Sequence, residues 1–278
     1  MMGTHENLSG RVAVITGGSG VLCSEMARTL AAQGVKVAIL NRTEEKGREV
    51  AEEINRNGGE AIAAAADVLD LDSLNETKDK ILGKFGRIDI LINGAGGNHP
   101  DAITDMETSG ETDTGKTFFD LEQNGFNRVF STNFTGSFMA SQVFGKDLLK
   151  QDHPVILNIS SMSAYSPMTK VPAYSAAKAS INNFTMWMAV HFAGDGLRVN
   201  AIAPGFFLTT QNKDLLTNPD GSLTPRSEKI MAGTPMKRFG KPEDLIGTML
   251  WLVDETYSGF VTGITVPVDG GFMAYSGV

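Results

Sequence analysis

Two side chains spaced along one predicted helix could exchange a proton with a substrate. Tyr174 and Lys178 are four residues apart, and this spacing places both side chains on the same face of a helix. An ammonium group next to a phenol favours the phenolate and lowers the pKa of the tyrosine toward the working pH. The pair therefore predicts a tyrosine that acts as general acid or base on a substrate oxygen.

A serine hydroxyl is expected to act on the same oxygen. Ser161 lies at the end of an apolar run over residues 155–159, thirteen residues before Tyr174. Such a hydroxyl can donate a hydrogen bond as negative charge develops on a substrate oxygen. Together the side chains predict a site for chemistry at a hydroxyl or carbonyl carbon.

A glycine-rich turn near the N-terminus could hold a pyrophosphate. Residues 16–20 follow an apolar run over residues 11–16 and open a helical pattern over residues 21–33. Backbone N–H groups and the positive end of the helix dipole favour an anion at such a turn. The expected contacts are Gly17, Ser19, Gly20, Val21 and Leu22; a plain strand-to-helix connection is the alternative.

The elements that position these residues alternate between strands and helices. Predicted strands cover residues 11–16, 35–40, 61–66, 88–92, 155–159, 199–203 and 264–268. Predicted helices cover residues 21–33, 44–57, 71–85, 126–149, 173–192 and 242–253. This order implies right-handed crossovers and a parallel sheet with helices on both faces, an α/β doubly wound, Rossmann-type fold. Ligands of such sheets bind beyond the carboxyl ends of the strands.

The chain is expected to form one domain over residues 1–278, because no linker or internal repeat divides it. A loop near residues 97–119 is expected to border the substrate. Residues 205–240 contain several Pro and Gly and little periodicity, which predicts a mobile substrate lid.

Several motifs occur in a fixed order along the chain. They are Thr16-Gly17, Asp67-Val68, Asn93-Gly94-Ala95-Gly96, Asn133-Phe134-Thr135-Gly136, Ser161, Tyr174-Ser175-Ala176-Ala177-Lys178 and Pro204-Gly205. From Arg11 to about Gly271 the chain thereby resembles the short-chain dehydrogenase/reductase family, and the ordered set is far more specific than a lone glycine-rich turn. The resemblance implies hydride transfer between a nicotinamide cofactor and a substrate carbon. It also implies a catalytic set of Asn133, Ser161, Tyr174 and Lys178.

The resemblance assigns further roles to these motifs. Asn133 is expected to bend the long helix and to anchor a water that relays protons to Lys178, which also holds the nicotinamide ribose. The glycine-rich turn departs from the family, because Val21 and Cys23 stand where the family has glycines. Gly20 is expected to supply the backbone freedom instead.

The other expected cofactor contacts follow the ends of the strands. Asp67 and Val68 are assigned to the adenine, with helix capping by Asp67 as the alternative. Residues assigned to the dinucleotide beyond the fourth and sixth strands are Asn93, Gly94, Ala95, Pro204, Gly205 and Thr209. A strand-ending turn is the alternative for Pro204-Gly205.

The end of the second strand predicts the cofactor preference. An acidic residue there prefers the free ribose 2′-hydroxyl of NAD, whereas a basic residue accommodates the 2′-phosphate of NADP. The chain has Asn41 and Arg42 at this point. NAD(P)H is therefore expected with a lean to NADP, although Asn41 can still bond a hydroxyl and Arg42 can be a solvated surface charge.

Composition excludes several other classes of protein. The formal net charge of −8 argues against a nucleic-acid partner. Cys23 is the only cysteine, which fits a reducing compartment. No signal peptide or membrane-spanning run is evident. A cytoplasmic protein without a metal site is expected.

The segment between Asn93 and Asn133 predicts the substrate. The chain is longer here than is usual in the family, and the extra residues 98–119 are acidic; a lid, a subunit contact and a solvated excursion are the alternatives. Residues 93–100 resemble family members that are D-mannonate oxidoreductases (fructuronate reductases). A sugar acid needs hydroxyl partners and a cation. The candidates are Asn98, His99, Ser163, Lys170 and Lys213.

Other functions remain open at this point. Gluconate 5-dehydrogenase and 3-oxoacyl reductase activities are alternatives within the same class. A non-catalytic dinucleotide-binding redox sensor is the alternative from another class. The resemblance further implies a homotetramer in which residues 126–149 and 173–192 pack against neighbouring subunits and the tail over residues 262–278 lies near an interface.

Overall fold

The chain folds around one seven-stranded sheet in which all neighbouring strands are parallel. The computed structural model describes residues 5–110, 114–209 and 216–277. The strands are β1 (Val12–Thr16), β2 (Lys36–Asn41), β3 (Ala61–Ala65), β4 (Ile90–Asn93), β5 (Val155–Ile159), β6 (Arg198–Pro204) and β7 (Thr265–Val268). Their order across the sheet is β3-β2-β1-β4-β5-β6-β7. The strand order reverses direction beside β1, which places the ligand crevice there.

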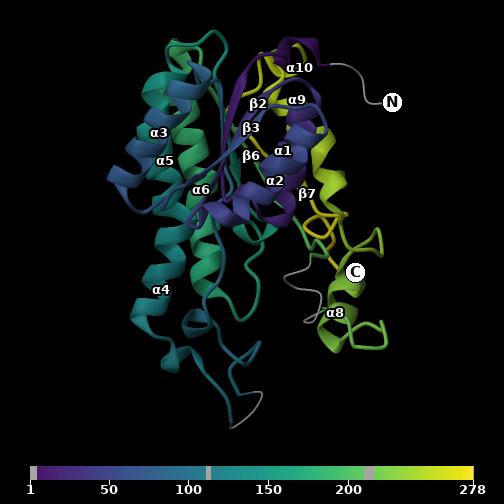
Figure 1. Cartoon of the computed structure of the whole chain (residues 1–278). Coiled ribbons are helices and arrows are strands. Elements are labelled where there is room, and N and C mark those ends of the chain that lie inside the picture. Colours follow the sequence, from purple (N-terminus) through teal and green to yellow (C-terminus); the bar gives the residue numbers. More distant parts are fainter. Residues whose placement is uncertain (1–4, 111–113, 210–215, 278) are drawn as a thin grey trace.

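Helices cover both faces of this sheet (Figure 1). The helices are α1 (Val21–Ala32), α2 (Glu44–Arg56), α3 (Leu71–Phe85), α4 (Gln123–Phe130), α5 (Gly136–Leu148), α6 (Pro172–His191), α8 (Pro225–Gly233), α9 (Ile246–Val253) and α10 (Glu255–Ser258). Short 3₁₀ turns are η1 (Glu6–Leu8), η2 (Pro100–Ala102), η3 (Phe118–Asp120), η5 (Met162–Ala164), η6 (Ala193–Asp195) and η7 (Pro242–Leu245). The predicted Rossmann-type α/β fold is confirmed.

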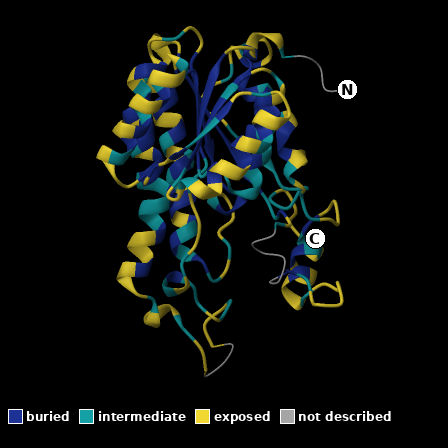
Figure 2. Ribbon diagram, viewed as in Figure 1, coloured by how far each residue is buried: buried dark blue, intermediate teal, exposed yellow. Residues whose placement is uncertain are grey.

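Two hydrophobic cores lie on opposite faces of the sheet. One packs α1, α2 and α9 against it, and the other packs α3, α5 and α6. The central strands are buried on both sides, as Figure 2 shows, and all five residues of β1 and of β5 are buried. This explains why these strands are nearly continuous apolar runs instead of alternating patterns. A firm sheet therefore holds the loops at its carboxyl edge.

Two helical predictions need correction. The helix predicted over residues 126–149 begins at Gln123 and is interrupted by a π-helical turn over Ser131–Thr135, labelled η4. The predicted lid over residues 205–240 contains the regular helix α8, whose start is capped by the Thr224 hydroxyl accepting from the Ser227 amide. Pro225 suits the first helical position, because it needs no N–H donor there.

Among the residues that the structure describes, none of the helices has the length and apolar character needed to cross a bilayer.

Candidate active site

Ser161, Tyr174 and Lys178 converge at the carboxyl end of β5. Helix α6 presents Tyr174 and Lys178 on one face, with the Lys178 ammonium 5.6 Å from the centre of the tyrosine ring. The Ser161 hydroxyl hydrogen-bonds the phenol. The Ser161 oxygen also accepts from the Ser163 amide at 3.2 Å, so its own proton remains available to donate. The three polar groups can therefore address a single substrate oxygen.

Burial controls the ionisation of this group. Burial raises the pKa of the Tyr174 phenol above its usual value, and the hydrogen bond with Ser161 offsets part of that rise. Burial also lowers the pKa of Lys178 to about 8, while its ammonium donates to the Ile159 carbonyl at 2.8 Å. The prediction of a lowered tyrosine pKa is therefore wrong, because desolvation of the phenolate outweighs the hydrogen bond with Ser161. A phenol that keeps its proton suits the role of acid in carbonyl reduction.

Asn133 fixes the segment that follows β4. Its side chain is fully buried and sits in the π-helical turn η4, which separates α4 from α5. The amide nitrogen donates to the Gly97 carbonyl at 2.7 Å, and the amide oxygen accepts from the Gly97 N–H at 3.2 Å. A Cβ at Gly96 would lie 2.4 Å from that oxygen and 3.5 Å from the Lys178 nitrogen. Asn133 and Lys178 therefore both lie next to the backbone of Gly96, where a larger residue would clash with the Asn133 side chain.

The glycine-rich turn fits a dinucleotide. Gly17 has φ +64°, and a Cβ there would lie 2.9 Å from the Ala95 Cα. The Thr16 hydroxyl accepts from the amides of Gly94 and Ala95 at 3.1 and 3.2 Å. No described side chain caps α1, so its first N–H groups can bind a pyrophosphate. The expectation for Gly20 is wrong, because its φ of −63° and ψ of 149° are open to any residue.

Cys23 replaces a family glycine without displacing the turn. Its side chain is buried, and a Cβ at Gly94 would lie only 2.2 Å from the Cys23 sulfur. The Cys23 side chain therefore occupies space that is free only because Gly94, after β4, has no side chain. Burial raises the pKa of the Cys23 thiol to about 11, so this group is a neutral packing residue near neutral pH.

The adenosine end of the predicted site lies at β2 and β3. The Asn41 side-chain oxygen accepts from the Ser19 amide at 3.2 Å, which ties the end of β2 to the glycine-rich turn, whereas Arg42 is exposed. Asp70, not Asp67, caps α3, which excludes capping as the role of Asp67. The Val68 side chain packs closely on Gly136: a Cβ at Gly136 would lie 2.6 Å from the Val68 Cγ2.

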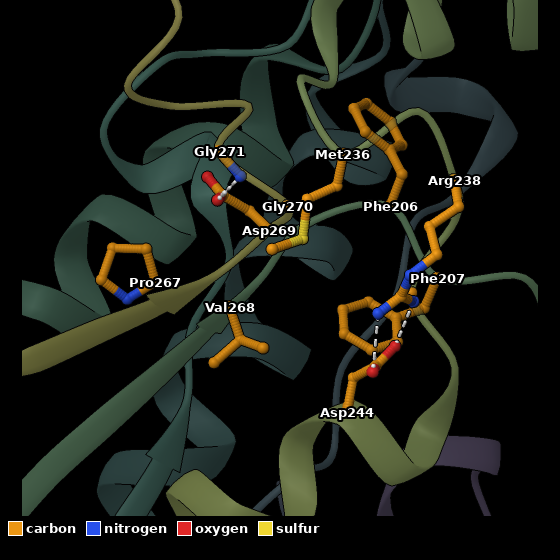
Figure 3. Close-up of a pocket in the computed structure, with 11 residues that line it drawn as sticks. Phe206, Phe207, Met236, Arg238, Asp244, Pro267, Val268, Asp269, Gly270 and Gly271 are labelled. Atoms are coloured by element: carbon orange, nitrogen blue, oxygen red, sulfur yellow. Dashed lines mark hydrogen bonds and ion pairs between the residues drawn. The ribbon is translucent and has the colours of Figure 1, made fainter.

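The loop at the predicted nicotinamide site is supported from behind. A pocket of about 380 Å³ is lined by residues that follow β6, by the end of β7 and the residues after it, and by the segment between α8 and α9; Figure 3 shows its lining. A Cβ at Gly205 would lie 2.6 Å from the Asp269 Cα, and the Asp269 carboxylate accepts from the Gly271 amide at 2.9 Å. Tyr174 is not part of the described lining, so this pocket borders the loop predicted to contact the nicotinamide and does not enclose the tyrosine. Pro204 ends β6, and Thr209 lies five residues further.

The predicted substrate residues are not all brought together. Asn98 is exposed, and Lys213 lies outside the described residues. The Ser163 hydroxyl is buried next to Ser161 and has no hydrogen-bond partner among the described residues. His99 contacts Asp101 through Nδ1 at 3.2 Å.

Lys170 and Arg128 are two of the cations in this region; a third, Lys116, donates through its ammonium to the Pro100 carbonyl at 3.3 Å. Lys170 lies just before α6 with φ +70°, a strained conformation for a residue with a side chain, and no described group pairs with its ammonium. Arg128 approaches His99 Nε2 at 3.3 Å. The sequence analysis did not include Arg128 among the candidate substrate residues. Its position five residues before Asn133, in the same predicted helix, could have suggested that it lies near the site.

The chain is similar to known proteins over almost its whole length. The family model described as short chain dehydrogenase matches residues 11–220. The chain is 75% identical over 278 residues to the uncharacterized oxidoreductase UxuB of Bacillus subtilis, which covers 100% of both chains. It is 32% identical over 270 residues to the 2-dehydro-3-deoxy-D-gluconate 5-dehydrogenase of Dickeya dadantii, covering 96% of this chain and 97% of that protein.

Among solved structures, one from Haemophilus influenza is named "putative D-Mannonate oxidoreductase" and contains bound NAD. It is 49% identical to this chain, covers 99% of each chain and superposes with a TM-score of 0.94. The likeness in backbone therefore extends from the glycine-rich turn to the loops beyond β6 and β7.

Proposed function

Because the chain belongs to the short-chain dehydrogenase family and is an NAD(P)-dependent oxidoreductase, we propose that it interconverts a keto-sugar acid and its alcohol, D-fructuronate and D-mannonate. The observation that carries the substrate is the Haemophilus structure with its name and its bound NAD. The Dickeya relative, a sugar-acid dehydrogenase by name, supports the same class of substrate. The structure supports the reaction type, because the Tyr174 phenol, the Ser161 hydroxyl and the Lys178 ammonium lie together at the carboxyl end of β5.

In this proposal each residue has a defined task. The nicotinamide supplies or accepts the hydride. Tyr174 donates its phenolic proton to the substrate oxygen during reduction and takes it back during oxidation. Ser161 donates a second hydrogen bond to that oxygen, and the Ser163 amide keeps the Ser161 hydroxyl turned toward it. Lys178 stabilises the phenolate that forms, and Asn133 holds the Gly96-Gly97 backbone beside it.

We propose NAD as the physiological cofactor. The structural relative at 49% identity contains NAD, and the lean to NADP drawn from Arg42 finds no support. Asn41 is already anchored by the Ser19 amide through its oxygen, which leaves the amide nitrogen to donate to a ribose 2′-hydroxyl. Gly17, Ser19 and the first turn of α1 would hold the pyrophosphate.

A substrate panel with both cofactors tests the substrate and the cofactor together. We expect D-fructuronate to support oxidation of NADH with a higher kcat/KM than the gluconate-derived ketone 5-keto-D-gluconate or a 3-oxoacyl thioester. The kcat/KM with NADH should exceed that with NADPH. Absorbance of the reduced nicotinamide gives both rates. Turnover only with the aldonate or the thioester would replace the substrate proposal by one of those activities. Cofactor binding without turnover on any compound would favour the redox sensor instead.

Lys170 is the residue we propose as the anchor of the substrate carboxylate. It lies four residues before Tyr174, outside α6, and its carbonyl accepts from the Thr104 amide at 2.9 Å, which holds the strained backbone. A Lys170→Met variant is expected to raise the KM for the sugar acid about ten- to a hundredfold with little change in kcat, because one charge-assisted contact is lost. The KM for an uncharged analogue, the corresponding sugar amide, should not change.

A lysine at the opposite end of the sheet provides the control for that experiment. Lys84 is exposed near the end of α3, just before β4 begins, so Lys84→Met removes the same charge far from the site. An equal rise in KM for the acid and the amide in Lys170→Met would contradict carboxylate recognition.

A homotetramer and a cytoplasmic location also remain part of the proposal. Helix α4, the π-helical turn η4 and helix α6 carry a row of aromatic side chains in contact, from Phe130 through Phe134 and Phe184 to Trp187. Trp187 is 56% exposed, which is unusual for so large an apolar surface on a single chain. Burial of this row against another copy is the expected basis of assembly.

A further inference from the structure

The acidic insertion between β4 and α4 is built onto the helix that carries Tyr174. Ala102 is only 1% exposed and packs with Val129 and Ala173, and Tyr174 packs against the same cluster. The Thr104 amide donates to the Lys170 carbonyl at 2.9 Å. The first part of the insertion is therefore a wall braced against the start of α6, and not a solvated excursion.

The wall is also locked to α4. A Cβ at Gly125 would lie 2.5 Å from the Asp101 Cβ and 2.8 Å from the Asp101 carbonyl carbon. The Glu122 amide donates to the Asp101 carbonyl at 3.1 Å. Because backbone meets backbone here, the wall cannot move without moving α4.

Further out, the insertion closes on itself and so presents Glu107 at a fixed place. The Asp105 amide donates to the Lys116 carbonyl at 2.8 Å, and the Lys116 amide donates to the Asp105 carboxylate at 2.6 Å. The Thr104 hydroxyl donates to the Met106 carbonyl at 2.8 Å. These bonds tie together the two sides of the loop that carries Glu107.

Glu107 reaches across to α8. Its carboxylate pairs with the Lys229 ammonium at 3.0 Å, although the two residues are 122 positions apart. Helix α8 rests on the molecule through the buried Ile230 and through the Ser227 hydroxyl, which donates to the Leu216 carbonyl. In Figure 1 the insertion and α8 project beyond the same end of the sheet. That end holds Ser161 and Tyr174.

We propose that the insertion is a positioning element for the substrate, and that the Glu107–Lys229 ion pair latches α8 against the wall that supports Tyr174. The latch fixes the position of α8 over the carboxyl end of the sheet, so it governs substrate affinity and leaves the proton transfer itself unchanged. This inference rests on the proposed function only for the substrate used in its kinetic test. The pair is partly exposed, with 32% of the Glu107 and 68% of the Lys229 side chain accessible, so salt weakens it.

Charge exchange tests the latch. Glu107→Gln and Lys229→Glu are expected to raise the substrate KM about two- to fivefold, the range of a partly exposed ion pair, while kcat stays within twofold. The exchanged pair Glu107→Lys with Lys229→Glu should return KM to within twofold of the unmodified enzyme. Raising the salt concentration should increase the KM of the unmodified enzyme more than that of Glu107→Gln, because screening of the substrate carboxylate is common to both and only the unmodified enzyme also has the ion pair to lose. Glu228→Gln removes a neighbouring carboxylate of α8 and serves as the control.

A second readout does not depend on the substrate. Amide hydrogen exchange over residues 225–233 should be about two- to fivefold faster in Glu107→Gln than in the unmodified protein or in Glu228→Gln, and the exchanged pair should reverse the change. Unaltered exchange in Glu107→Gln, or an exchanged pair no better than the single variants, would overturn the latch. If no sugar acid is turned over but exchange responds as stated, the latch stands and only the substrate proposal fails.

Discussion

A Tyr174→Phe variant is expected to lose kcat by about a thousandfold, within the range of 10²- to 10⁴-fold that a positioned general acid contributes. The change removes only the phenolic oxygen, so the ring keeps its packing against Ala102, Val129 and Ala173. Cofactor affinity should stay within about threefold, because the pyrophosphate and adenosine contacts lie at the other strands. NADH binding is measured by fluorescence and kcat by absorbance. A large loss of kcat with unchanged NADH binding is the result expected when the general acid is removed.

A second tyrosine supplies the matched control for this variant. Tyr165 is 47% exposed, and its hydroxyl donates to the Thr265 carbonyl at 3.3 Å. Tyr165→Phe makes the same chemical change away from the converging groups and should retain kcat within about twofold. A Tyr174→Phe enzyme with turnover within tenfold of the original would rule out the assigned proton donor.

The fold was predictable because parallel strands leave a strong pattern. Strands buried on both faces, such as β1 and β5, are unbroken apolar runs, and each is followed by a turn and a helical period. The pairing of Tyr174 with Lys178 followed from helix geometry alone. The π-helical turn at Asn133 was not predictable from the sequence pattern, since local propensity does not distinguish a π-helical turn from an α-helix.

The rest depended on contacts between distant parts of the chain. The direction of the Tyr174 pKa follows from burial, which a spacing of four residues does not reveal. The fit of Cys23 depends on Gly94 in another strand-end loop. Helix α8 has nine residues and begins at a proline, so it carries too short an apolar period to stand out from a Pro- and Gly-rich segment.

The second large effect is expected from Lys178→Met, which should lower kcat about a hundredfold or more and weaken NADH binding about tenfold. The substitution keeps a long apolar stem in a buried place but removes the ammonium that donates to the Ile159 carbonyl. It also removes the positive charge 5.6 Å from the centre of the tyrosine ring, so the phenolate formed in catalysis loses that stabilising charge. Measuring kcat and the NADH dissociation constant separately shows how the loss divides between chemistry and binding.

The pH dependence then identifies the group responsible. The pKa of Lys178 is lowered to about 8, so the ammonium is present below pH 8 and is lost as the pH rises through that value. Contacts that need the ammonium should therefore be complete at pH 7, and the NADH dissociation constant should rise between about pH 8 and 10. The variant Lys178→Met should show no such step, because methionine does not titrate.

An arginine at this position separates charge from geometry. Lys178→Arg keeps its charge throughout this pH range, so its binding profile should also lack the step near pH 8, while its kcat falls because a planar guanidinium does not reproduce the bond to the Ile159 carbonyl. A step that persists in both variants would assign the ionisation to another group and remove Lys178 from cofactor binding. A step confined to the unmodified enzyme ties cofactor affinity to one buried ammonium, the same group that must stabilise the phenolate of Tyr174.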